Sequence, residues 1–227
     1  MTTTLALLHK QIKDSLCNFQ ALMVMLIYPL VAFVMITALG SEDGMSGMFV
    51  TMFATMHASF APLVTASNIL SEEKEKGTLR ALIMTGVSRR QYLMSVSLFV
   101  VSVTLLTGSA FLVMDAFTRE HIAAFAAAML CGAVLSTLAG LCVGIVSRNV
   151  SAANGMAVPI GLVTALLPML ARFNESLDCA ARYLYSGQIS RVLDGGELTG
   201  EFAAIMAAYA VLLTALLAFL FKKKGLE

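Results

Sequence analysis

Six long runs of apolar residues constrain this chain more than any other feature. Each run is nearly free of charge and long enough to cross a bilayer core of roughly 30 Å as a helix, which takes about 20 residues. The runs are continuous, whereas strands of a membrane barrel alternate with a period of two. The sequence therefore predicts an all-α integral membrane protein with six transmembrane helices. The predicted spans cover residues 20–39, 48–70, 92–114, 122–146, 153–171 and 202–221.

Composition excludes a water-soluble core and a nucleic-acid partner. Hydrophobic residues make up 59% of the 227 positions, against roughly 45–50% in soluble domains. The net charge is only +1, from 15 basic and 14 acidic residues, so no overall field recruits nucleic acid. Polar Thr2 to Thr4 and an amphipathic stretch precede a full-length first span, which differs from a cleavable signal peptide. We expect one transmembrane domain over residues 1–227.

The positions of the basic residues predict the orientation. With six spans and both termini cytoplasmic, the inner side holds eleven of the 15 and the outer side four. This asymmetry is the one that the positive-inside rule requires, and flipping the chain inverts it. The inner set is Lys10, Lys13, Lys74, Lys76, Arg80, Arg89, Arg90, Arg148, Lys222, Lys223 and Lys224. The outer set is Arg119, Arg172, Arg182 and Arg191.

Small residues at fourfold spacing predict helix packing surfaces. Contacts between helices in lipid depend on side chains that let backbones approach closely. Span four carries one such ridge, and span five carries another that contains Gly161. Each is expected to pack on a neighbouring helix, with contact between the two ridges left open. The ridge residues are Gly132, Ser136, Gly140 and Gly144 in span four, and Ala153, Ala157, Gly161 and Ala165 in span five.

Prolines and cysteines give weaker signals. Pro29, Pro62, Pro159 and Pro168 should each bend or interrupt a span, because proline removes one hydrogen bond of the helix. Cys131 and Cys142 lie within span four, where small apolar packing is the expected role. Cys17 is predicted inside and Cys179 outside, so a disulfide within the chain is not expected. Cys179 could cross-link two copies.

Charged and apolar residues also pattern the segments between the spans. In residues 1–18, Leu5, Leu8, Ile12 and Leu16 recur at helical spacing, which predicts an amphipathic helix in the membrane interface. Residues 71–91 form a densely charged cytoplasmic loop in which Gly77 ends the tail of span two. Thr78 is predicted to cap a short helix from Leu79 to Thr85, and Gly86 to end it. Ser88 and Gln91 form a capping box that opens span three.

The same loop carries a family resemblance. The run Glu73-Lys74-Glu75-Lys76-Gly77-Thr78-Leu79, followed by Thr85-Gly86-Val87-Ser88, resembles the loop after the second span of type-2 ABC export permeases. Six spans in about 230 residues, an N-terminal elbow helix and a long loop before the last span extend the resemblance to most of the chain. It implies a subunit of a bacterial-type plasma membrane exporter.

The resemblance implies partners and a role for this loop. Two permease copies, identical or related, would work with two separate nucleotide-binding ATPase subunits in membrane lipid. The short helix would be the coupling helix that sits in a cleft of the ATPase. ATP and Mg²⁺ would bind in that subunit, because this chain has no G-x-x-x-x-G-K-[ST] phosphate loop and is not expected to be an enzyme or to hold a cofactor or metal. The residues expected to couple to the ATPase are Glu72, Glu73, Glu75, Lys76, Gly77, Thr78, Leu79, Arg80, Leu82 and Ile83.

Polar residues within spans two and five mark a candidate translocation pathway. The resemblance places the route at the dimer centre between these spans. Polar groups in hydrocarbon need partners or water, and His57 is the one ionisable residue deep in a span. Packing by a hydrogen bond to a neighbouring helix is an equal alternative for His57. The candidate lining residues are Thr51, Thr55, His57, Asn68, Asn154, Met156 and Thr164. The 15 methionines suit an amphipathic or hydrophobic substrate such as a peptide, drug or lipid.

Residues 172–201 predict one or two short helices at the outer interface, with tyrosines at headgroup level. Ser186-Gly187-Gln188 matches the signature loop of ABC ATPases only by chance.

Three other functions compete with the exporter. A secondary transporter usually keeps carboxylates in mid-membrane, and none lies in these spans. A non-transporting immunity or sensor protein on the same scaffold is a second alternative that the sequence does not exclude. For the charged loop itself, the alternative is a merely solvated segment that sets the topology. An intramembrane enzyme is disfavoured, because no cluster of His, Cys and carboxylates suggests a reactive site.

Overall fold

The computed structural model describes residues 7–13, 19–39, 45–114 and 119–224, and every regular element in these ranges is a helix. The predicted all-α fold is confirmed for this part of the chain. Residues 7–13 are helical, while the rest of the predicted elbow, including Leu5 and Leu16, lies outside the described residues. The helices that follow are α2 (Phe19–Leu39), α3 (Met45–Glu75), α4 (Thr78–Met84), α5 (Arg89–Met114), α6 (Arg119–Val146), α7 (Val150–Ala171), α8 (Glu175–Arg182), α9 (Tyr185–Leu193) and α10 (Gly200–Lys224).

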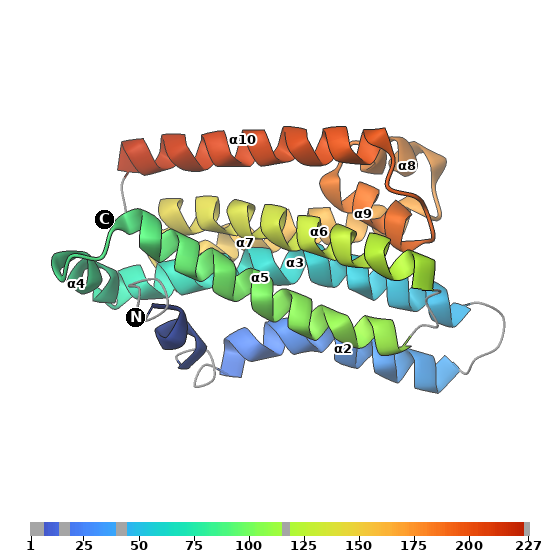
Figure 1. Ribbon diagram of the computed structural model, residues 1–227, viewed down its shortest axis with the longest axis horizontal. Helices are drawn as coiled ribbons and strands as arrows, with labels where there is room; N and C mark the ends of the chain where they lie inside the picture. The colour runs from blue at the N-terminus through green and yellow to red at the C-terminus, as the bar shows by residue number, and fades with distance from the viewer. Residues whose placement is uncertain (1–6, 14–18, 40–44, 115–118, 225–227) are drawn as a thin grey trace.

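Long helices lie side by side along the length of the molecule (Figure 1). Five of them, α3, α5, α6, α7 and α10, are long and apolar enough to cross a membrane. The apolar stretch of α2, Leu22–Ala38, is shorter. The helix of residues 7–13, the Lys224 end of α10 and α4 lie at one end of the bundle, which we call the α4 end, and α8 and α9 lie at the other (Figure 1). The chain is therefore a multi-pass membrane protein.

Helix α3 is the centre of the bundle, and both small-residue ridges pack on it. An ideal Cβ atom on Gly140 of α6 would lie 2.3 Å from the carbonyl oxygen of Leu63 in α3. A Cβ atom on Gly161 of α7 would lie 2.8 Å from the ring of Phe60. Helix α3 is thus the shared neighbour of both ridges. The glycines let two helix backbones approach α3 in lipid, where no hydrophobic force pulls helices together.

The four prolines lie inside continuous helices, so of the two predicted effects, bending or interruption, none of the four causes interruption. Pro62 shows how one site is compensated. Its ring nitrogen cannot donate to the carbonyl of Ala58, four residues earlier. The hydroxyl of Ser136 on α6 donates to this oxygen instead, at 3.0 Å. A side chain of a neighbouring helix thus restores the hydrogen bond that proline removes.

Candidate functional site

Helix α4 is a separate element, joined to α3 and α5 through two glycines. Gly77 has φ +69° and Gly86 has φ +90°, the left-handed region that glycine adopts without strain. Helix α3 therefore ends at Glu75 and does not run on into α4 as one rod. The predicted short helix between two glycine turns is present, and it projects from the α4 end of the bundle (Figure 1).

The caps of this loop match the prediction in part. The Ser88 hydroxyl accepts from the amide of Gln91 at 3.2 Å, and the Gln91 side chain accepts from the amide of Ser88 at 3.1 Å. The predicted capping box is confirmed. The prediction of Thr78 as the N-cap of α4 is wrong, because Gly77 caps it and Thr78 is the first helical residue. The Thr78 hydroxyl instead donates back to Glu73 in α3, to the carbonyl oxygen at 3.2 Å and to the carboxylate.

Helix α4 has an inner face and an outer face. Leu79 is buried against the apolar core of the α4 end, and Leu82 and Ile83 are partly buried on the same core. Arg80 is exposed, and Met84 is 81% exposed. Leu79 therefore anchors the helix to its own bundle, and the exposed residues of α4 are Thr78, Arg80, Ala81 and Met84.

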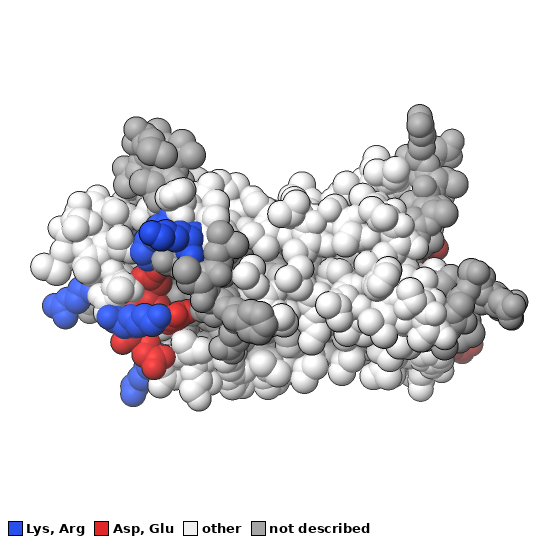
Figure 2. Space-filling view, turned by 90° about the horizontal axis from the view of Figure 1, so that it is seen from below, with Lys and Arg blue, Asp and Glu red and all other residues white. Residues whose placement is uncertain are grey.

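The charged run before α4 contacts several helices of this chain. Glu73 is buried, and its carboxylate pairs with Lys10 of the N-terminal helix. Lys76 pairs with Glu72 one turn earlier on α3, at 2.5 Å. Figure 2 shows Lys, Arg, Asp and Glu side chains gathered at the α4 end of one face, while the described residues in the middle of that face are uncharged. The alternative of a merely solvated loop does not fit Glu73, because its carboxylate is buried and paired with Lys10 rather than surrounded by water. Removing Lys10 would leave a buried charge without its partner, which is strongly destabilising.

Lys74 and Glu75, at the end of α3, reach the junction between α6 and α7. The Lys74 ammonium donates to the carbonyl oxygens of Ile145 and Ser147, at 2.8 and 2.7 Å, and to that of Gly144 at 3.3 Å. A Glu75 carboxylate oxygen accepts from the amide of Val150, at 3.0 Å. Sequence reasoning missed this function of Lys74, because a charge pattern does not reveal which distant backbone a side chain contacts.

Most of the pathway candidates in α3 lie inside the chain. His57 is fully buried, and its Nε2 atom lies 3.1 Å from the carbonyl oxygen of Thr104 and 3.1 Å from the hydroxyl of Thr107, both in α5. Thr51 and Thr55 are also buried, whereas Asn68 is half-buried. These contacts fit the packing alternative for His57.

The candidates in α7 are more accessible. Met156 is exposed, while Asn154 and Thr164 are half-buried. A face of α7 that contains Met156 is therefore exposed in this chain. Lining of a pathway by any of the seven residues stays a prediction.

Two short helices occupy the end opposite α4, as the sequence predicts for residues 172–201. Tyr183 is 70% exposed, but Tyr185 is only 3% exposed. Tyr185 therefore faces the inside of the protein, because α9 is buried against the core of the bundle, and the predicted headgroup level of the tyrosines stays a prediction. Burial raises the pKa of the Tyr185 hydroxyl, which keeps its proton.

The Tyr185 hydroxyl joins α9 to the proline site of α3. It lies 2.9 Å from the hydroxyl of Ser136. Since Ser136 gives its single proton to the Ala58 carbonyl, Tyr185 donates to Ser136. Helices α3, α6 and α9 are thus connected by one chain of buried hydrogen bonds beside Pro62. Serine and tyrosine 49 residues apart give no sequence signal of this contact.

Three arginine–carboxylate pairs hold this end together. Arg172 at the end of α7 binds Asp194 after α9 at 2.7 Å and the Thr51 hydroxyl of α3 at 3.1 Å. Arg191 of α9 binds Asp178 of α8 at 2.9 Å. Arg182 binds Glu201 at 2.6 Å, and this carboxylate raises the pKa of Arg182. The basic residues at this end are thus largely neutralised by carboxylates.

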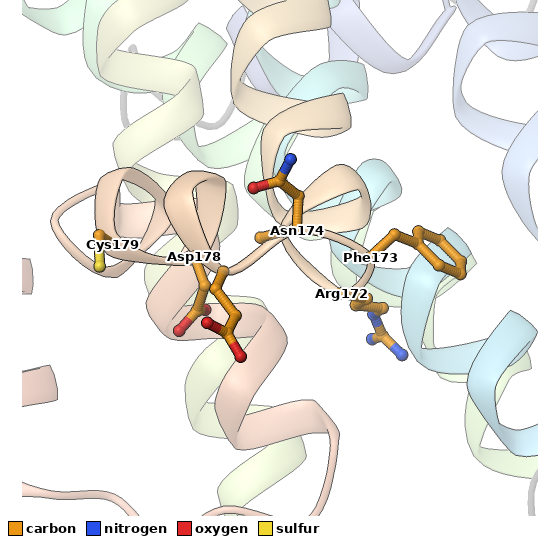
Figure 3. A pocket seen from close by; sticks show the side chains of 7 residues that line it. Arg172, Phe173, Asn174, Asp178 and Cys179 are labelled. Carbon is orange, nitrogen blue, oxygen red and sulfur yellow. The ribbon is translucent and has the colours of Figure 1, made fainter.

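An open hollow of about 470 Å³ lies where α7 meets α8. Figure 3 shows Arg172 and Phe173 on one side of it and Asp178 and Cys179 on the other. Among the described residues, no group of three His, Cys, Asp or Glu side chains is placed to hold a metal ion.

Comparison with known proteins identifies the family. No curated protein matches the chain significantly. The family model described as "ABC-2 family transporter protein" matches residues 36–189, about two thirds of the chain. The match includes α3 to α8 and the α3–α4–α5 loop that carries the resemblance noted in the sequence. Since this family comprises the membrane components of transporters, catalysis of ATP hydrolysis is not expected in this chain. The protein belongs to the ABC-2 family of transporter permeases.

Proposed function

We propose that this chain is the membrane subunit of an ATP-driven exporter, and that α4 is its contact with a separate nucleotide-binding subunit. The observation that carries the proposal is the structure of α4. It is a short helix between two left-handed glycines, anchored inward by Leu79 and open outward at Arg80 and Met84. A helix held in this way can bind a partner subunit through its exposed face and transmit movement to the bundle through its buried face.

The proposed orientation places the α4 end in the cytoplasm of a cell with a bacterial-type plasma membrane. The α4 end carries Arg80, Arg90 and Arg148, all exposed, and the Lys222–Lys224 end of α10. The positive-inside rule assigns such an end to the cytoplasm. Because the helix of residues 7–13 and the Lys224 end of α10 both lie at this end, α2 would complete an even number of six spans, despite its shorter apolar stretch.

In the proposed mechanism, closure of two nucleotide-binding subunits displaces α4 in each of two permease copies. ATP and Mg²⁺ are held by those subunits, whose differential contacts with α4 supply the free energy of the change. The turn at Gly77 joins α4 to α3, and the turn at Gly86 joins it to α5. The hydrogen-bonded contact of Ala58, Ser136 and Tyr185 then links α3 to α9 at the far end. An amphipathic or hydrophobic substrate suits the apolar, methionine-containing surface of α7.

The test is co-purification with a nucleotide-binding subunit encoded by a neighbouring reading frame, in lipid nanodiscs. We expect the double substitution Arg80→Glu, Met84→Glu to reduce recovery of that subunit at least tenfold, because it places two carboxylates on the outer face of α4. Leu79 and Glu75 are unsuitable for this test, since both contact the rest of the chain. The matched control is Tyr183→Glu, an equally exposed position at the opposite end.

The outcomes separate the exporter from its alternatives. Loss of the ATPase with the α4 variant and retention with the control support the proposal. Equal recovery from both variants would favour a function independent of ATP, such as a secondary transporter or a sensor.

A further inference from the structure

We propose that Lys74 and Glu75 form a clamp that transmits movement of α4 to the junction between α6 and α7. The inference rests on the proposed function, and it assigns to this chain a second route for the motion besides α3 and α5. The clamp consists of two consecutive side chains of α3 and the helix ends that they bind. It explains why the charged run extends α3 beyond the predicted end of span two at residue 70.

The Lys74 half of the clamp binds the end of α6. An α-helix leaves its last carbonyl groups without intrahelical partners, and a cation there is favoured by the helix dipole. Lys74 donates to two such oxygens, those of Ile145 at 2.8 Å and Gly144 at 3.3 Å, and to that of Ser147, directly after the helix, at 2.7 Å. Lysine has three donors on its ammonium group, so each hydrogen can serve one oxygen.

The Glu75 half binds the start of α7. Here the unsatisfied groups are amides, and a carboxylate is the favoured charge. Glu75 accepts from the amide of Val150 at 3.0 Å, while the Asn149 side chain accepts from that of Ala152 at 2.8 Å. The order of charges along α3 thus matches the order of helix ends at the junction. Exchanging the two charges would place each one against the wrong helix end.

Tight packing beside the clamp prevents α3 from sliding past α6. An ideal Cβ atom on Gly144 would lie 2.9 Å from the Cβ atom of Leu70, one turn before Lys74. The Thr78 hydroxyl donates to Glu73 next to the clamp, which ties the first residue of α4 to the same turn of α3. A displacement of α4 therefore moves the turn that holds α6 and α7.

The clamp is tested by amide hydrogen exchange of the full-length permease in nanodiscs, first without any partner. In Lys74→Met, exchange of the amides of residues 147–152 should rise at least tenfold, and Lys74→Arg should restore most of the protection. Lys222→Met removes a lysine charge from the same end of the molecule and should leave these amides unchanged. Unchanged exchange in Lys74→Met would overturn the clamp whatever the function of the protein.

The transmission is tested in the complex with the nucleotide-binding subunit, with and without ATP and vanadate. In the wild type, nucleotide should change exchange both in α4 and in residues 147–152. In a Lys74→Met, Glu75→Gln variant that still binds the subunit, the change in α4 should remain and that in residues 147–152 should disappear. If nucleotide changes exchange in wild-type α4 but not in residues 147–152, the proposed transmission is wrong, while the proposed exporter function remains supported. No response in wild-type α4 would overturn the proposed function, and the transmission with it.

Discussion

Replacing Gly140 with alanine is expected to lower the stability of the bundle by about 3 kcal/mol, the upper end of typical overpacking costs. The new methyl group would lie 2.3 Å from the carbonyl oxygen of Leu63 and 3.0 Å from the Cβ atom of Ala66. The oxygen belongs to the backbone of α3, so no side-chain rotation can relieve the contact. Helices α3 and α6 must separate, and the contacts on both sides of Gly140 are lost.

The measurement is the thermal unfolding midpoint of purified protein in detergent, compared with a matched variant. Gly155 of α7 has no atom within 4 Å of its ideal Cβ position. Gly155→Ala should therefore leave the midpoint unchanged or raise it, because alanine favours a helix by up to about 1 kcal/mol over glycine. Equal midpoints for the two variants would show that α3 and α6 do not approach as closely as described.

Replacing Gly187 with alanine is expected to have an effect of similar size, about 3 kcal/mol, at the opposite end. Its ideal Cβ atom would lie 1.9 Å from the carbonyl oxygen of Ala181 and 2.7 Å from its carbonyl carbon. Helix α9 could not keep its place beneath α8, and the nearby hydrogen bond from Gln188 to the Arg182 carbonyl, at 2.7 Å, would break. The need for glycine in Ser186-Gly187-Gln188 is thus explained by packing, without any relation to an ATPase.

Amide exchange localises the effect of Gly187→Ala. Residues 185–193 should exchange faster than in the wild type, and the unfolding midpoint should fall. The control is Gly200→Ala at the start of α10, where a Cβ atom meets nothing within 4 Å. A protected α9 in the Gly187→Ala variant would contradict the described position of this helix.

Sequence reasoning predicted the elements whose causes are local. A continuous apolar run and a charged boundary define a span wherever it lies, so the long helices and the loop after α3 were expected. The Ser88–Gln91 capping box was also found, because both partners lie within one turn. The ridges of small residues predict that α6 and α7 each pack closely on a neighbouring helix. They do not predict that α3 is that neighbour for both.

The errors and omissions concern contacts between distant residues. Tyr185 resembles an interfacial tyrosine in sequence, and only the packed structure shows its hydroxyl bound to Ser136. The ring of Pro62 predicts a weakened helix, yet a serine 74 positions later supplies the missing donor to Ala58. The sequence also does not reveal that Glu73 and Leu79, two of the residues expected to couple to the ATPase, are buried within this chain.

Site-specific photo-cross-linking from position 84 in living cells tests most directly whether α4 is gripped by a cytosolic ATPase. A photoreactive residue at Met84 should yield an adduct whose mass-spectrometric sequence contains a G-x-x-x-x-G-K-[ST] phosphate loop, and the same residue at Tyr183 should not. Both side chains are largely exposed, and they lie at opposite ends of the bundle. An ATPase adduct from position 183, or none from position 84, would contradict the account.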